Sequence, residues 1–145
     1  PDTLAEAGAC VHEAAGVDRI PAPGRAVVAG NAAVLRIEPL KCWLIGVDTP
    51  SIDPRIGASL DLSHSRTRIQ VSGHSGVSLL NRFLPLDLRQ GSFPEGSVAS
   101  SALHHVGVTL WRSSDGYELF IPRGFARSCW EVILESARQF SVEVR

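Results

Sequence analysis

The sequence is poor in several residue types that would otherwise suggest a function. Its 145 residues include no methionine, one tyrosine and a single lysine, and aromatic residues make up 6%. No apolar run approaches the roughly 18 residues that a membrane-spanning helix requires. Neither sign of charge dominates, because 14 basic residues face 15 acidic ones and the pI is about 6.6. This balance removes the electrostatic basis for binding nucleic acid or an anionic membrane.

Cysteine is also scarce, and its three positions are far apart. Cys10, Cys42 and Cys129 are odd in number, and no two of them form a C-x-x-C motif. A disulfide framework or a zinc site would need a different count or spacing. The pattern favours free thiols in a reducing compartment, and we therefore expect a cytoplasmic protein.

What the sequence does contain is enough apolar residue content for a folded core. Hydrophobic residues make up 44% of the chain and charged residues 20%, which is typical of a globular domain rather than a disordered chain. The length corresponds to one domain. We expect a single domain over 1–145, with halves at about 1–58 and 59–145.

The first half has the pattern of a helix followed by a hairpin. Apolar and small residues recur at helical spacing over 3–15, Thr3 and Glu6 have the spacing of a capping box, and Gly16 ends the segment. Two strands are predicted at 33–38 and 42–47. The remaining segments, which are rich in proline and turn residues, are predicted as loops at 20–24 and 48–58.

The second half alternates between strand and helix patterns. Polar and apolar residues alternate over 66–72, and the Ser-Asp-Gly run at 114–116 predicts a tight hairpin turn with positive φ at Gly116. In the last and strongest helix, an apolar stripe includes Trp130 and Ile133, both expected to be buried. The other predicted elements are a helix at 77–83, a loop at 89–97, strands at 106–112 and 117–121, and the last helix itself at 125–140. Together the elements predict an α+β fold with an antiparallel sheet and covering helices.

The histidines do not form a recognisable metal site. His104 and His105 are adjacent near the start of a predicted strand, where neighbouring side chains point to opposite faces and cannot chelate one ion. His64 and His74 flank another strand, and no carboxylate lies at metal-ligand spacing from them. Ordinary hydrogen-bonded histidines are the simpler interpretation.

Candidate nucleophiles and acids are equally unspecific. Ser63 and His64 are sequence neighbours, whereas a serine and its base normally meet from distant positions. Cys129 lies in the apolar stripe of the last helix, so burial is its expected role. Asp61 and Asp87 lie at the edges of regular elements, where a carboxylate usually caps or turns the backbone.

Motifs for cofactors are missing as well. Residues 73–76 read GHSG, which is neither a dinucleotide-binding fingerprint nor a phosphate-binding loop. Trp43, Trp111 and Trp130 stand in apolar runs and are interpreted as core or partner-facing aromatics. The residues therefore predict no catalytic, cofactor-binding or metal-binding residue, which favours an accessory protein over an enzyme.

A series of motifs from residue 60 onward resembles a known family. In order, the motifs read LDLSHSRTRIQVSG, LLNRFLPLDL, FPEGS, HHVGVTLWR and GYELFIPRGFARSCWEVILESA. Their order is similar to the gamma subunit of heterotetrameric sarcosine oxidase. The resemblance covers about 85 residues well. A more remote resemblance connects the chain to the folate-binding domain of the glycine-cleavage aminomethyltransferase.

The resemblance implies a non-catalytic gamma subunit of a bacterial oxidoreductase complex. Such complexes demethylate sarcosine to glycine and transfer the one-carbon unit to tetrahydrofolate. FAD, FMN, NAD and tetrahydrofolate are expected in the other subunits and none in this chain. The expected direct partner is the alpha subunit, with beta and delta subunits in the same complex and no nucleic acid or membrane.

Three alternatives stay open, of which one is a stand-alone binding module for an unrelated protein. Related complexes act on other N-methylated amino acids such as N-methylglutamate and carry gamma-like chains, and the substrate is set by another subunit. The chain could also be a stand-alone folate-binding protein.

Overall fold

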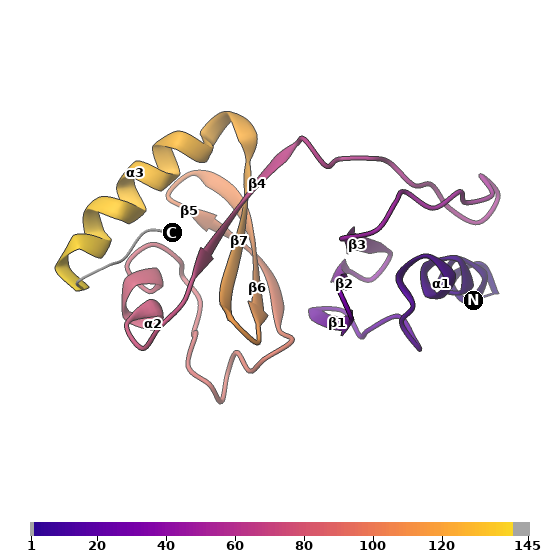
Figure 1. Ribbon diagram of the computed structural model, residues 1–145, viewed down its shortest axis with the longest axis horizontal. Coiled ribbons are helices and arrows are strands. Elements are labelled where there is room, and N and C mark those ends of the chain that lie inside the picture. Colours follow the sequence, from indigo (N-terminus) through magenta and orange to yellow (C-terminus); the bar gives the residue numbers. More distant parts are fainter. Residues whose placement is uncertain (1, 141–145) are drawn as a thin grey trace. The chain divides into compact units, whose positions relative to one another are not determined.

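The computed structural model describes residues 2–140, which form two compact units. The first contains the described residues up to 62 and the second those from 63 onward, so the division falls shortly after the loop expected at 48–58. Both units are shown in Figure 1. The interpretation of the whole chain as a single domain stays a prediction.

The first unit consists of one helix and a three-stranded antiparallel sheet. Helix α1 (Asp2–Ala15) ends at Gly16, whose φ of +65° suits a residue without a side chain. The strands are β1 (Arg25–Ala29), β2 (Ala32–Glu38) and β3 (Lys41–Ile45), in the order β1-β2-β3. The hairpin predicted from the second and third strands is confirmed.

The sequence analysis was wrong about two features of this unit. Thr3 does not cap the first helix, because α1 already begins at Asp2 and Thr3 lies inside its first turn. Strand β1 was not predicted, since its RAVVA segment follows a proline-rich turn and is too short to show an alternating pattern.

The core of the unit is small, and its buried members are Val11, Ala15, Val17, Ala32 and Val34.

The second unit is a four-stranded antiparallel sheet with helices on one face. Its strands run in the order β4-β7-β6-β5. In chain order the unit contains β4 (Arg66–Val71), α2 (Gly76–Leu80), β5 (Val98–Leu103), β6 (Val106–Ser113), β7 (Gly116–Pro122) and α3 (Ala126–Ala137), with 3₁₀ turns at Arg123–Phe125 and Arg138–Phe140. The predicted α+β architecture with an antiparallel sheet is therefore confirmed.

The core of the second unit lies between this sheet and its two helices. Alternate strand residues such as Ile69, Val108 and Leu119 pack against α2 and α3, which lie on the same side of the sheet in Figure 1. The loop between α2 and β5 is fixed to the core by Tyr117, whose hydroxyl donates to the carbonyl oxygen of Leu88 at 2.9 Å. One hydrogen bond from a buried ring thus positions a loop that has no regular structure of its own.

Two sequence predictions in this unit are confirmed and one is half wrong. Gly116 has a φ of +146°, in the region that favours glycine, and Ile133 is buried. Trp130, in contrast, is only partly buried against the core. It packs against the core cluster from α3, but part of its surface stays accessible.

Candidate functional site

The histidines expected near the start of a strand form a turn instead. His104 and His105 are the two residues between β5 and β6, and both are exposed. His104 has a φ of +54°, which a tight hairpin turn requires and which side chains rarely adopt. Both histidines do lie directly before a strand, as expected, but regular strand geometry does not apply to them, because β5, whose VASSAL segment alternates too weakly to be predicted, makes the segment a hairpin turn.

The other candidate residues are not brought together. His64 and His74 are exposed, and no group of three or more metal-binding side chains occurs among residues 2–140. The carbonyl oxygen of His64 accepts a long hydrogen bond of 3.5 Å from Arg123.

The three thiols are free, and two of them are shielded. Burial raises the pKa of the Cys129 thiol, which is 3% exposed in α3. Burial also raises the pKa of Cys42, although the nearby Arg36 guanidinium opposes this effect. Because the thiolate is the reactive form, both cysteines are poor nucleophiles at neutral pH. The expected burial of Cys129 is confirmed.

Asp87 has the turn-stabilising role expected of it. Its carboxylate accepts hydrogen bonds from the backbone N–H of Arg89 at 3.2 Å, from the Arg89 guanidinium at 2.6 Å and from the Ser92 hydroxyl at 2.7 Å. These bonds, with that from the Arg89 side chain as the strongest, hold the pKa of Asp87 well below its usual range. A carboxylate held in this way is a weak base.

A buried carboxylate that the sequence analysis did not single out lies in β7. Glu118 is fully buried. Its carboxylate accepts a hydrogen bond of 2.8 Å from Arg68 Nε and another of 3.0 Å from the Ser113 hydroxyl. The bond to Glu118 raises the pKa of Arg68 above its usual value. Trp111 lies beside this group, 5.8 Å from the Arg68 guanidinium, and its indole N–H has no partner among the described residues. The alternation of YELFI could have revealed Glu118, because it places a carboxylate beside Phe120 on one face.

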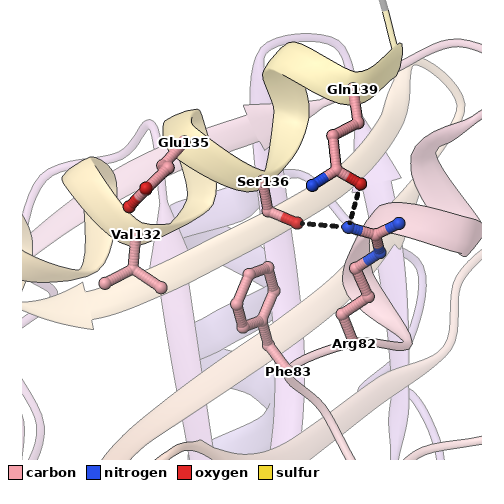
Figure 2. A pocket seen from close by; sticks show the side chains of 6 residues that line it. All are labelled: Arg82, Phe83, Val132, Glu135, Ser136 and Gln139. Carbon is pink, nitrogen blue, oxygen red and sulfur yellow. Dashed lines mark hydrogen bonds between the residues drawn. The ribbon is translucent and has the colours of Figure 1, made fainter.

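An open pocket lies on the second unit between α3 and the turn after α2. Figure 2 shows its six lining residues, which enclose about 280 Å³: Arg82, Phe83, Val132, Glu135, Ser136 and Gln139. Arg82 Nη1 donates to Ser136 Oγ at 3.0 Å and to Gln139 Oε1 at 2.8 Å. The guanidinium also lies 4.8 Å from the centre of the Phe140 ring. Charged and apolar side chains therefore share one surface.

Comparison with known proteins connects this fold to one enzyme family. The chain is 29% identical over 105 residues to the sarcosine oxidase gamma subunit of an Arthrobacter species, and 27% identical over 143 residues to that of Corynebacterium sp. strain P-1. These alignments cover 72% and 97% of this chain and 52% and 70% of the relatives. The chain is therefore similar over most of its length to sarcosine oxidase gamma subunits.

One solved structure and one further relative also resemble this chain. The fold matches a chain of heterotetrameric sarcosine oxidase from Corynebacterium sp. U-96, solved in complex with pyrrole 2-carboxylate, with a TM-score of 0.75 and 22% identity. The match covers 95% of this chain and 76% of that one. An aminomethyltransferase from Koribacter versatilis is 31% identical over 87 residues, as the remote resemblance predicted. No family model matches the chain.

The gamma family members are longer than this chain in the aligned comparisons. The chain spans about half of the Arthrobacter gamma subunit and about a quarter of the aminomethyltransferase. No helix within residues 2–140 is long and apolar enough to cross a membrane.

Proposed function

We propose that this chain is a non-catalytic accessory subunit of a heterotetrameric sarcosine oxidase. The observation that carries the proposal is its similarity to gamma subunits, which in one case extends over 97% of the chain. In such a complex the larger subunits oxidise sarcosine to glycine and deliver the one-carbon unit to tetrahydrofolate. This chain supports their assembly through contact with the alpha subunit, alongside beta and delta. Its three free cysteines agree with a cytoplasmic location.

The cofactors of the complex are assigned to its other subunits. A pterin ring carries N–H donors, and a buried carboxylate with open oxygens is a strong acceptor for such donors. Glu118 is the one buried carboxylate among the described residues, and Arg68 and Ser113 already occupy its oxygens. Glu118 is therefore not open to a pterin ring, and tetrahydrofolate, FAD, FMN and NAD are all expected elsewhere in the complex. This argument favours the accessory role over a stand-alone folate-binding protein.

Co-expression with the flavoprotein alpha and beta chains and the delta chain tests the proposal. The chain should co-purify at one copy per complex, and its deletion should reduce the yield of assembled complex more than the rate of flavin reduction per complex. Purified alone, it should lack the visible absorption of flavin and show no activity on sarcosine. Tetrahydrofolate binding to the isolated chain with micromolar affinity in calorimetry would contradict the accessory role.

The same complex also tests whether the chain belongs to a sarcosine oxidase or to a related dehydrogenase of another N-methylated amino acid. Sarcosine and N-methylglutamate are supplied in turn, and the initial rate of flavin reduction is compared. Faster reduction by sarcosine supports the proposal. Faster reduction by N-methylglutamate would assign the chain to a related dehydrogenase while leaving its accessory role intact.

A further inference from the structure

We propose that the pocket between Arg82 and Glu135 docks a segment of the larger partner subunit that carries an acidic side chain next to an apolar one. The inference rests on the accessory function proposed above and assigns a surface to it. The acidic side chain pairs with Arg82, and its apolar neighbour covers Phe83 and Val132. A basic residue of the same segment reaches Glu135 on the other side of the pocket (Figure 2).

The hydrogen bonds of Arg82 leave one face of its guanidinium open. Both of its hydrogen bonds within residues 2–140 come from Nη1 and go to the neutral acceptors Ser136 and Gln139. Nε–H and Nη2–H receive no acceptor from the described residues. These two donors form the side of the guanidinium that binds both oxygens of a carboxylate. Arg82 is thus held in place by neutral groups while its preferred partner is missing.

The Phe140 ring adds to this positioning. It lies 4.8 Å from Arg82 Cζ, within the distance at which a cation is attracted to an aromatic face. A side chain held by two acceptors and a ring has already lost much of its rotational freedom. A carboxylate that binds to it therefore pays less ordering entropy than it would at a free surface arginine.

The charges of the pocket are complementary to such a segment. Arg82 and Glu135 have opposite charges, and neither forms an ion pair with another residue of the described chain. Elsewhere on α3, Arg127 and Glu131 do pair with each other at 3.0 Å. The two unpaired charges therefore call for a partner with one acidic and one basic group.

The apolar part of the pocket and its size favour a protein segment over a small molecule. Val132 is 37% exposed on α3, and Phe83 lies beside it, fixed by an edge-to-face contact with the His104 ring at 5.9 Å. The cavity of about 280 Å³ lies at the lower limit of small-molecule sites, which enclose about 300–1,000 Å³. A pocket of this size fits one or two side chains of a docked segment.

A binding experiment between the purified 145-residue chain and the separately purified larger subunits tests the docking surface. Arg82→Glu should weaken binding by about tenfold or more, because it places like charges together. Arg82→Lys should have a smaller effect than Arg82→Glu, because it keeps the positive charge. It should still weaken binding, because it removes the paired Nε–H and Nη2–H donors. Val132→Arg leaves the hydrogen bonds of Arg82 intact and should also weaken binding. Arg127→Glu, the same charge change at an exposed position of α3, is the control and should bind within about twofold of wild type.

Circular dichroism and thermal unfolding of each variant establish that the fold is retained. If folded Arg82→Glu and Val132→Arg bind like wild type, the docking surface is wrong while the accessory function stands. If Arg127→Glu weakens binding as much as Arg82→Glu, the effect is one of net charge and the docking surface is likewise wrong. If the wild-type chain does not bind the larger subunits, the accessory function fails as well.

Discussion

Arg68 and Glu118 lie diagonally across neighbouring strands and form an ion pair whose members differ sharply in exposure. Arg68 Nε and Glu118 Oε2 are 2.8 Å apart, yet the Arg68 side chain is 48% exposed and that of Glu118 is 1% exposed. In the register of β4 and β7, Gln70 faces Glu118 and Arg68 faces Phe120. The long arginine reaches from the edge strand inward and brings its charge to a carboxylate that water does not reach.

Removal of Arg68 should therefore lower the free energy of unfolding more than neutralisation of Glu118 does. Arg68→Ala leaves a buried carboxylate without a counter-ion, and we expect a loss of about 3 kcal/mol in the free energy of unfolding. Glu118→Gln keeps an acceptor for Ser113 and should cost less. The double variant should be more stable than Arg68→Ala alone. Urea unfolding of the two single variants and the double variant measures these differences. A double variant less stable than Arg68→Ala would contradict the prediction.

Gly116 should not tolerate a side chain. A Cβ at this position would lie 2.5 Å from the carbonyl oxygen of Val71, and its φ of +146° is strained for alanine. We expect Gly116→Ala to lower the free energy of unfolding by more than about 1 kcal/mol. Gly107→Ala in the neighbouring strand is the control, since a Cβ there meets no atom within 4 Å. Equal stability of the two variants in thermal unfolding would show that the β6–β7 turn adapts.

The loss of stability when a side chain of α3 is truncated should depend on how deeply it is buried rather than on its size. Ile133 is 3% exposed, whereas Trp130 is only partly buried. Ile133→Ala should cost about 2–5 kcal/mol, and Trp130→Ala should fall below the 3–5 kcal/mol typical of a fully buried ring. Chemical denaturation of both variants tests this order. A loss below about 1 kcal/mol for Trp130→Ala would indicate that the ring faces a partner or solvent.

The Asp87 carboxyl should titrate at unusually low pH. Its folded-state pKa is lowered, mainly by the Arg89 side chain, so the pair contributes stability above the unfolded pKa of about 3.9. That contribution is lost as the pH falls through the folded pKa. Carboxyl ¹³C NMR should show the low value in wild type and a value closer to 3.9 in Arg89→Ala. An unchanged titration in the variant would assign the shift to Ser92 and the backbone instead.

Cys129 should be the slowest thiol to react. Its pKa is raised by burial, and little surface is open to a reagent. With an aromatic disulfide reagent at pH 8, Cys10 should react first and Cys129 only as the protein unfolds. The rates are followed by absorbance, and Cys129→Ala should remove only the slow phase. A fast phase lost in that variant would place Cys129 at the surface.

The sequence predicted the elements whose patterns are strong and missed those defined by their neighbours. The stripe of α3 and the Asp-Gly turn before β7 are local signals, and both were found. Strand β5 has two serines and two alanines, so only its pairing with β6 identifies it. His104 was misplaced for the same reason, because a turn is recognised only when both of its strands are known.

The candidate surface illustrates a further limit of sequence analysis. Arg82 and Ser136 are distant in sequence, and no motif joins them before the turn after α2 meets α3. The pairing of Arg68 with Glu118 is hidden in the same way, since each residue fits a simple alternating strand. The family resemblance, in contrast, depends on the order of short motifs and required no knowledge of side-chain contacts.

The tight turns that connect β5, β6 and β7 also have a consequence for the order of folding. Leu103 pairs with Val106 across one turn, and Ser113 pairs with Gly116 across the next. Strand β4 instead joins β7 from far earlier in the chain, with Val71 paired to Tyr117. Since closing a long loop costs more entropy than closing a short one, the three consecutive strands form the low-contact-order part of the sheet. We therefore expect attachment of β4 to be the slow, topology-limited step, and it is the step that brings Arg68 to Glu118.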